Sequence, residues 1–548
     1  MLFALAWQDH AVIVGYLALT LLIGYLASRR QETNDEYFLA SRGLPWFAVG
    51  LSVLATLLSS LTYLSEPGEV WRSGVMNFLG KMLAIPVEMY IVWAFFIPFL
   101  MRFRFTSAYE YLEFRFNYPA RLLGTTLFCC MTIAWMGLVV LMTSRALTHV
   151  TGMPLWAVIA TVGVVATIYT TMGGLRAVVW TDALQMLLML AGAIITMVFV
   201  ARTTNSGPLE WYRGTMAYRL DQHKPELEWF SGSPFTRATV LTVALQMFLW
   251  HLCTHSGNQM TVQRYFATKN IRRARRAFIT ASLAGVVVNA MLMMVGLALV
   301  YFCIKGPGKL PSAGKEDELF PLFMVQHLPP GWAGAVLAAV LAAAMSSIDS
   351  GINSLATVLC VEGARKPPQS AYTPGASRLK SPGDDGLLKA AKWITVVAGL
   401  AITLVAMALD RATGDRNIVD MMPRSFNCFT APMGGMFLIG IFLPFVTGRA
   451  IVPATVIGLA SGLAMAYAKP LGLTQQDISF TWIVPGSMWI QTLCAIVFSL
   501  LDRPQPQNTF GLTWFTRHQA FLMAVPTEDA RPAALQDDVR DLSIDSQS

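Results

Sequence analysis

The sequence predicts an all-α integral membrane protein with about thirteen transmembrane helices. Of its 548 residues, 55% are hydrophobic and only 13% are charged, and the mean hydropathy is +0.52. A soluble domain carries about 25% charged residues. Runs of about 20 apolar residues, the length that a bilayer core requires, recur along the whole chain. Most of the chain is therefore expected to face lipid or other apolar helices.

The hydropathy profile places each span in order. The expected limits are 9–28, 45–65, 77–100, 121–147, 153–171, 176–201, 239–262, 277–304, 331–360, 389–409, 425–446, 451–469 and 482–501. The first run is long and is followed, not preceded, by Arg29 and Arg30, so it predicts a retained helix and not a signal peptide.

Basic residues predict the orientation in the cell inner membrane. They cluster in loops on one side of the spans, most densely at Lys269–Arg276, and this side is expected to be the cytoplasm. The N-terminus then lies outside and the C-terminus inside. The same rule explains the formal net charge of +8 without a nucleic-acid partner. The loop at about 366–388, rich in Pro, Ser and Gly, is expected to be cytoplasmic and mobile.

Neither an enzyme nor a sensor is expected. A membrane enzyme needs a nucleophile with a base, or a metal cluster, and His251 and His255 lie within a span without such a motif around them. We therefore predict no metal site built from histidine or cysteine. The seven cysteines lie in or beside apolar runs, as packed thiols do. The acidic tail after Arg503 is too short for an appended signalling domain.

Two spans carry features that weaken helices. The second span is interrupted by Ser59, Ser60 and Thr62, and the seventh contains His255–Asn258 in its interior. These two spans are five helices apart. Interrupted helices at corresponding positions of two repeats indicate a transporter binding site, because irregular backbone at membrane depth must line a cavity. The alternative is a pair of kinked structural helices.

The ninth span presents polar oxygen atoms on one helical face. The residues of this face, at i, i+3, i+4 and i+7, are Ala343, Ser346, Ser347 and Ser350. Asp349 and Asn353 lie beside it. Hydroxyl, carbonyl and carboxylate oxygens are hard donors that suit a small alkali cation such as sodium. The alternative is a serine-rich packing face, but a carboxylate within a span marks an ion or proton pathway by default.

A third feature joins two consecutive spans. Gly173–Gly174 is expected to break the chain between them, and Asp182 follows at about the second turn of the next helix. Asp182 is a candidate cation ligand. The alternative is a carboxylate that interacts favourably with the start of a helix.

These segments together resemble the sodium:solute symporter family, whose members have a LeuT-type fold. The matching motifs occur in the family's order over about residues 9–500 and are WFAVGLSVLATLLSSLTYLSEPGEV, TMGGLRAVVWTDALQ, NQMTVQRYFATKN, AAAMSSIDSGINS and TAPMGGMFLIGIF. Any one motif alone would be weak, whereas five in order are specific.

The resemblance implies a domain organisation. A ten-helix core at 45–446 would consist of two inverted repeats of five helices, at about 45–201 and 239–446. One extra helix at 9–28 would precede the core. Two extra helices at 451–502 and a cytoplasmic tail at 503–548 would follow it.

The resemblance also implies sodium ligands. The family's conserved site uses carbonyls of the first core helix with carbonyls and hydroxyls of the eighth, and it maps onto Ala55, Leu58, Ala343, Ser346 and Ser347. A second site in some members maps onto Asp182, Ser346, Asp349 and Ser350. This sequence departs from those members, which have serine where Asp349 stands. The extra carboxylate would either strengthen a second sodium site or carry a proton.

The substrate-binding residues of the family correspond less directly to residues of this sequence. Sugar-binding positions of the family fall on Leu57, Leu61 and Thr62, which argues against the same sugar recognition, whereas sialic-acid-carrying members match better at Ser59 and Thr62. The carboxylate-binding arginine of those members falls on Trp135. The remaining candidates for solute binding are two cations, Lys81 and Arg424, either of which can equally be an interfacial residue, and two residues of the seventh span, Trp250 and Thr254.

The sequence thus predicts a sodium-coupled symporter that imports a small polar organic solute, such as a carboxylated sugar or a monocarboxylate, by alternating access. A proton-coupled symporter of the same fold is the alternative, and a passive channel stays formally open.

Overall fold

The chain is described by a computed structural model that covers residues 6–28, 34–103, 105–223, 227–311, 315–363, 385–413, 418–502 and 509–518. Over these residues the secondary structure is helical throughout, with no strand, as the predicted all-α class requires. Arg29, Arg30 and most of the predicted loop at 366–388 and of the tail after Arg503 lie outside the described residues.

The helices follow one another in this order: α1 (Trp7–Ser28), α2 (Asn34–Leu39), α3 (Trp46–Leu57), α4 (Ser60–Ser73), α5 (Met76–Ile91), α6 (Ile97–Leu100), α7 (Glu110–Arg115), α8 (Tyr118–Thr151), α9 (Leu155–Thr204), α10 (Pro208–Asp221), α11 (Val240–Gly257), α12 (Gln259–Phe266), α13 (Ile271–Lys305), α14 (Leu319–Gln326), α15 (Trp332–Gly363), α16 (Asp385–Thr413), α17 (Ile418–Phe442), α18 (Gly448–Ala466) and α19 (Ile483–Leu501). A π-helical turn, Val92–Phe96, joins α5 to α6.

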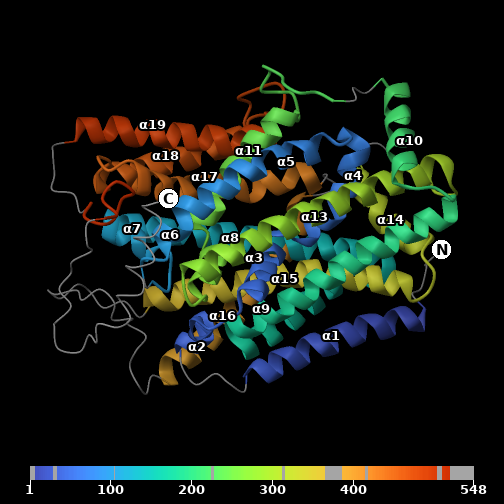
Figure 1. The fold of residues 1–548 in the computed structure, drawn as a ribbon, viewed down its shortest axis with the longest axis horizontal. Helices are drawn as coiled ribbons and strands as arrows, with labels where there is room; N and C mark the ends of the chain where they lie inside the picture. Colours follow the sequence, from blue (N-terminus) through green and yellow to red (C-terminus); the bar gives the residue numbers. More distant parts are fainter. Residues whose placement is uncertain are drawn as a thin grey trace, which may run out of the picture.

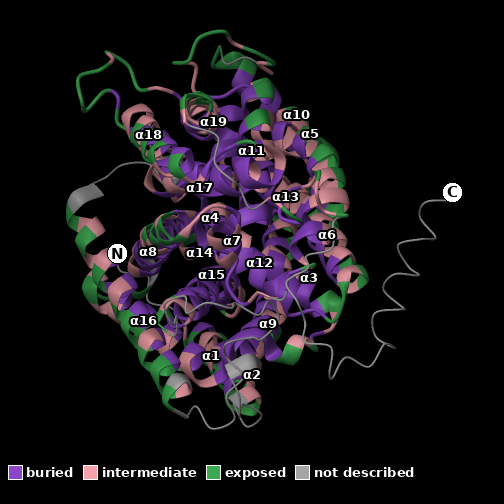
Figure 2. Cartoon of the chain, turned by 90° about the vertical axis from the view of Figure 1, so that its left-hand side faces the viewer, coloured by how far each residue is buried: buried purple, intermediate pink, exposed green. Residues whose placement is uncertain are grey.

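The long helices lie side by side with their axes along one direction, with α1 at one edge of the bundle and α18 and α19 at the opposite edge (Figure 1). Buried residues fill the interior and exposed residues lie around the outside (Figure 2). Large apolar side chains such as Leu187, Trp393 and Leu493 are among the exposed ones. An apolar exterior around a helical interior is what a bilayer requires, since helices satisfy their own backbone hydrogen bonds.

Ten helices of the described chain are long and apolar enough to cross a membrane, or eleven when the bent pair α3 and α4 is one span. This establishes a multi-pass membrane protein. The two predicted spans 153–171 and 176–201 correspond to the two parts of α9, which Gly174 divides. α11 is not among these membrane-crossing helices because Gln246, His251 and His255 make it more polar. The count of thirteen therefore remains a prediction.

Three breaks occur where the sequence predicts them. The axes of α3 and α4 differ by 63° across Leu58 and Ser59, both of which have extended backbone. Gly174 interrupts α9 with a φ of 53° and a ψ of −163°, a conformation that essentially requires glycine. Asn258 separates α11 from α12 with a φ of −81° and a ψ of 115°, and its side chain caps α12.

The buried helix α15 is anchored at its start by α1. Asp9 Oδ1 accepts hydrogen bonds from the N–H groups of Gly331 (2.7 Å) and Gly334 (2.6 Å). A carboxylate at this position satisfies free amide groups and interacts favourably with the positive end of the helix dipole. The contact is close, since a Cβ atom added at Gly334 would lie 2.5 Å from the Asp9 Cα.

Candidate functional site

The break after α3 exposes backbone carbonyls inside the bundle. The last four carbonyls of a helix have no intrahelical partner. Here α15 supplies partners: Ser346 Oγ donates to the Ala55 carbonyl (3.0 Å), and Ser347 Oγ donates to the Thr56 carbonyl (3.3 Å). Ser346 Oγ also lies 3.1 Å from the Ala343 carbonyl. At this point α3 and α15 are therefore joined by hydroxyl and carbonyl oxygens.

The chemistry of this cluster fits sodium. Four of the five predicted ligands are brought together by the contacts above, and the fifth, Leu58, is the residue at which α3 ends. All five are buried. Every donor is a carbonyl or hydroxyl oxygen, and the C-terminal end of α3 adds a partial negative charge. A neutral oxygen set next to a helix C-terminus attracts a monovalent cation without binding it irreversibly.

A second polar cluster surrounds Asp182 on α9. Its Oδ2 accepts from Ser52 Oγ on α3 (2.5 Å) and from Arg264 Nη2 on α12 (3.0 Å). Arg264 Nη2 also donates to Ser350 Oγ (2.5 Å), which in turn donates to the Ser346 carbonyl (2.6 Å). The second cluster is thus linked to the first by Ser350.

Asp349 lies in the same region. Its Oδ2 accepts a hydrogen bond from the Tyr169 hydroxyl (3.0 Å), and its Oδ1 lies 3.4 Å from Ser350 Oγ. Asp182 Oδ1 is buried and has no hydrogen-bond partner among the described residues. When all groups are ionised, Asp182 and Asp349 carry two negative charges and Arg264 carries one positive charge. The cluster then has one excess negative charge, which one bound cation would neutralise.

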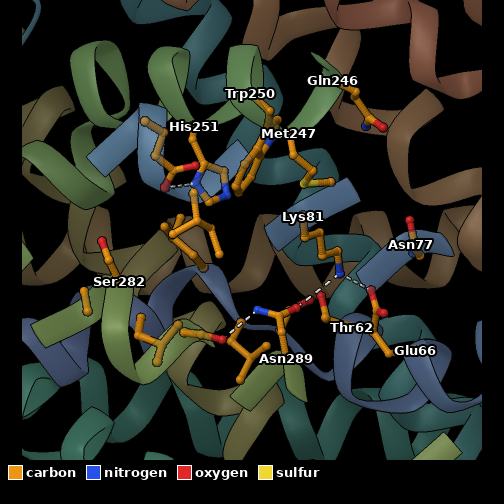
Figure 3. A pocket seen from close by; sticks show the side chains of 18 of the residues that line it. Thr62, Glu66, Asn77, Lys81, Gln246, Met247, Trp250, His251, Ser282 and Asn289 are labelled. Atoms are coloured by element: carbon orange, nitrogen blue, oxygen red, sulfur yellow. Dashed lines mark hydrogen bonds and ion pairs between the residues drawn. The ribbon is translucent and has the colours of Figure 1, made fainter. Parts of the chain in front are cut away.

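A cavity of about 180 Å³ opens beside the break. Figure 3 shows Trp250 and His251 on one side of it and Lys81, Glu66 and Asn289 on another. Lys81 forms an ion pair with Glu66 and donates to Asn289 Oδ1 (3.3 Å). The positive charge of Lys81 is therefore already balanced.

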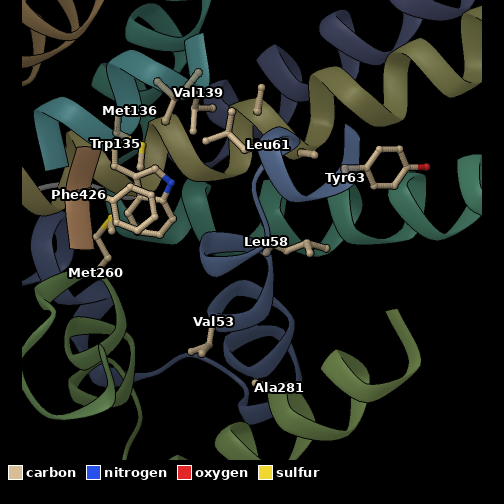
Figure 4. Close-up of a cluster of buried hydrophobic side chains, with 14 of the residues drawn as sticks. Val53, Leu58, Leu61, Tyr63, Trp135, Met136, Val139, Met260, Ala281 and Phe426 are labelled. Carbon is tan, nitrogen blue, oxygen red and sulfur yellow. The ribbon is translucent and has the colours of Figure 1, made fainter. Parts of the chain in front are cut away.

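The structure places the predicted substrate residues in two groups. Ser59, Thr62, Lys81, Trp135 and Trp250 line the cavity together with Leu58. Trp135 stacks on Phe426, with ring centroids 4.9 Å apart, on the far side of the break from Val53 (Figure 4).

The other two predicted residues do not line the cavity. Thr254 is buried and its hydroxyl donates to the Trp250 carbonyl (2.8 Å). Arg424 is paired with Asp477 (2.9 Å) and donates to the Ala466 carbonyl (3.2 Å), between α17 and α18.

Some charged residues were not assigned a role from the sequence. Arg264 lies within the NQMTVQRYFATKN motif and is fully buried, and Glu66, Glu69 and Glu88 line the cavity. A usable signal existed, because an ionisable residue within a span is a functional candidate by default. The partners of these residues, in contrast, come from distant parts of the chain.

Known proteins are similar to this chain over most of its length. A model of the sodium:solute symporter family matches residues 37–458. A sodium/sialic acid symporter from Proteus mirabilis is 31% identical over 482 residues, which cover 88% of this chain and 92% of the relative. Sodium-coupled monocarboxylate transporter 1 of Xenopus laevis is 30% identical and is matched over 95% of this chain and 83% of its own length.

A solved structure also matches. A substrate-bound, outward-open Na⁺-coupled sialic acid symporter superposes with a TM-score of 0.79 at 28% identity, over 92% of this chain and 99% of that chain. The predicted LeuT-type fold, sodium coupling and transport class are therefore confirmed, and the function is not enzymatic. The chain belongs to the sodium:solute symporter family and is a sodium-coupled symporter.

Proposed function

We propose that one sodium ion binds between α3 and α15 at Ala55, Leu58, Ala343, Ser346 and Ser347, and that the imported solute binds in the adjacent cavity. The observation that supports this proposal is the position of Leu58. It ends the helix whose carbonyls meet Ser346 and Ser347, and it also lines the cavity. Ion and solute would therefore be bound by the two sides of one break.

This shared break provides the coupling. Sodium would replace the hydroxyl hydrogens of Ser346 and Ser347 as the partner of the α3 carbonyls and hold α3 against α15. The cavity lining next to the break would then be complete, and solute would bind more tightly. When α3 moves away from α15, the sodium ion and the solute would both lose ligands and leave together. Coupling of this kind requires only that sodium binds the two states with different affinity.

The orientation and the domain boundaries are part of the same proposal. With the N-terminus outside and the C-terminus in the cytoplasm of a cell with an inner membrane, the two five-helix repeats at 45–201 and 239–446 would alternate the access of the cavity. Extra helices at 9–28 and 451–502 would flank them. One positive charge that enters through 100 mV contributes about 2.3 kcal/mol to solute accumulation, before the sodium gradient is added.

The proposed solute is a small polar carboxylate, such as a carboxylated sugar or a monocarboxylate. Both relatives named above are described as carriers of such compounds. The cavity offers hydroxyls at Ser59 and Thr62, and Lys81 can exchange its Glu66 partner for a solute carboxylate as a charge-assisted pair. Trp135, stacked on Phe426, supplies an apolar wall and no charge.

A second cation is proposed at Asp182, Asp349 and Ser350. The observation that favours it is the excess of one negative charge around Arg264, together with the free Asp182 Oδ1. Sodium bound to these oxygens or a proton on Asp349 would each neutralise the cluster. The proton version corresponds to the alternative of a proton-coupled symporter.

Uptake into proteoliposomes tests the proposal. An inward sodium gradient is compared with choline for sialic acid, short monocarboxylates, hexoses, inositol and proline. We expect concentrative, sodium-dependent uptake of a carboxylate that is lost in Ser346→Ala and kept in Ser461→Ala. Ser461 is a matched control because, among the described residues, its hydroxyl bonds only its own helix, at the Gly458 carbonyl (2.8 Å). Equal uptake in choline, driven by a proton gradient, would refute the sodium site, and uptake of neutral solutes alone would refute the solute class.

A further inference from the structure

Three potential metal ligands meet at the wall of the cavity. Glu88 on α5 and His251 and His255 on α11 each place one ligand atom within 4.8 Å of the others. The two histidines are four residues apart and so occupy the same face of α11. The sequence analysis placed both histidines within one span but predicted no metal site there. The third ligand could not be recognised from spacing, because it lies on another helix.

The ligand atoms are incompletely satisfied within the protein. Glu88 is almost wholly buried, and its Oε2 has no hydrogen-bond partner among the described residues. Glu88 Oε1 lies against His251 Nδ1, but this contact lacks the alignment of a hydrogen bond, and within the described chain His251 Nδ1 has no other partner. A buried, unpaired carboxylate oxygen needs an explanation, such as an ion.

His255 is oriented for the same role. Its Nδ1 lies 2.7 Å from the Tyr265 hydroxyl, so Nε2 is the nitrogen that remains to bind a ligand. A histidine that binds a metal through one ring nitrogen almost always uses the other in a hydrogen bond that fixes the ring. The ring is also held between neighbours, since it packs edge-on against Phe278 with centroids 5.1 Å apart.

We propose that Glu88, His251 and His255 form a binding site for a divalent transition-metal cation with the preferences of Zn²⁺. Two imidazole nitrogens and one carboxylate favour such a cation over sodium, magnesium or calcium, which prefer oxygen ligands. Three protein ligands leave a fourth, tetrahedral position open. All three residues line the cavity, so the open position faces it and can hold water or another oxygen ligand.

The bound cation would affect the rate of transport although it does not occupy the proposed sodium site. It would connect α5 to α11, and α11 ends at Asn258, the break that precedes α12. A metal bridge restrains the relative movement of these two helices. We therefore expect Zn²⁺ to slow transport without competing with sodium for ligands, which makes the site inhibitory.

Equilibrium binding tests the site without any knowledge of the solute. The full chain, purified with a tag that contains no histidine and stripped with EDTA, is titrated with Zn²⁺ against a chromophoric chelator. We expect one Zn²⁺ per chain in the micromolar range or tighter. Binding should weaken at least tenfold in each of Glu88→Gln, His251→Gln and His255→Gln. Co²⁺ in place of Zn²⁺ should give the visible absorption of a tetrahedral site.

Two further variants separate a metal site from a general loss of structure. His327→Gln changes a histidine that packs on Phe302 and Phe323 away from the cavity, and it should bind Zn²⁺ as the wild type does. His251→Cys keeps a zinc ligand and should retain binding that His251→Gln loses. Absence of Zn²⁺ binding in the wild type would show that Glu88, His251 and His255 do not form a metal site. Undiminished binding in all three glutamine variants would place the metal elsewhere, and either result overturns the proposal.

Discussion

Arg264 and Asp182 form an ion pair that is fully enclosed by protein. Arg264 Nη2 lies 3.0 Å from Asp182 Oδ2, and the exposed fraction of both side chains is 0%. Ser52 of α3 joins the pair, because it accepts from Arg264 Nε (2.6 Å) and donates to Asp182. The pair therefore connects α9, α12 and the interrupted helix α3.

Replacement of one partner of this pair should be costly. Arg264→Gln leaves Asp182 and Asp349 without a balancing charge in a dry environment, and loss of one partner of a buried pair costs about 3–5 kcal/mol. We expect a clear fall in the midpoint of thermal unfolding in detergent. The double variant Arg264→Gln/Asp182→Asn should be less destabilised than Arg264→Gln alone. The control is Arg145→Gln, which breaks a partly exposed pair with Asp410 and should change the midpoint little. If Arg264→Gln and Arg145→Gln lowered the unfolding midpoint equally, the buried pair would have no special importance for stability.

The hydroxyl of Ser347 should contribute measurably to sodium affinity. Ser347→Ala removes one of five oxygen ligands, and an interaction with a charged group is worth about 1.5–3 kcal/mol, which corresponds to roughly tenfold to hundredfold weaker binding. Sodium-dependent thermal stabilisation, which rises with the ratio of ligand concentration to Kd, gives the affinity. A change of less than about twofold would show that Ser347 is no ligand.

Asp349 should determine the number of cations that move with each solute. Asp349→Asn removes one negative charge but keeps an oxygen that can accept from Tyr169. We expect uptake to continue through the first site with one cation fewer per solute, measured from the reversal potential of solute-coupled current. If uptake by Asp349→Asn no longer depended cooperatively on the sodium concentration, the second cation would be sodium. If uptake no longer depended on pH, the second cation would be a proton. An unchanged stoichiometry would exclude Asp349 from either role.

Close packing at Gly334 should matter for stability. In Gly334→Ala the new methyl group would lie 2.5 Å from Asp9 Cα and 2.8 Å from the Asp9 carbonyl oxygen, and these backbone atoms cannot move cheaply. Overpacking of this kind costs about 1–3 kcal/mol. Thermal unfolding should show the loss, whereas Gly15→Ala in α1, where nothing lies within 4 Å of the added carbon, should be nearly neutral.

The sequence predicted the fold class and the breaks well because both depend on local composition. Apolar run length indicates a span, and Gly174 or the polar residues around Ser59 indicate where a helix is interrupted. The sodium ligands proposed from the resemblance meet in the structure for a similar reason: the serine face of α15 and the exposed carbonyls of α3 are each visible in one short segment.

Partnerships across the bundle could not be predicted in the same way. The pairing of Lys81 with Glu66, of Asp182 with Arg264 and of Glu88 with His251 depends on which faces of separate helices meet. A hydropathy profile averaged over a span does not specify which faces of two helices meet. Arg424 shows the same limit, since the sequence left open whether it binds solute or is an interfacial residue, and its partner in the structure is Asp477 in the segment between α18 and α19.

The attachment of α15 to α1 through Asp9 bears on which half of the proposed sodium site would stay in place during transport. Asp9 holds the start of α15 through the N–H groups of Gly331 and Gly334, and α15 is buried along nearly all of its length, whereas α3 is short and ends at a 63° bend. If the two helices separate during transport, we expect α3 to move and α15 to stay in place. α15 would then be the fixed frame of the transport cycle, so a distance probe on α15 would be a suitable reference for measuring the motion of the other helices.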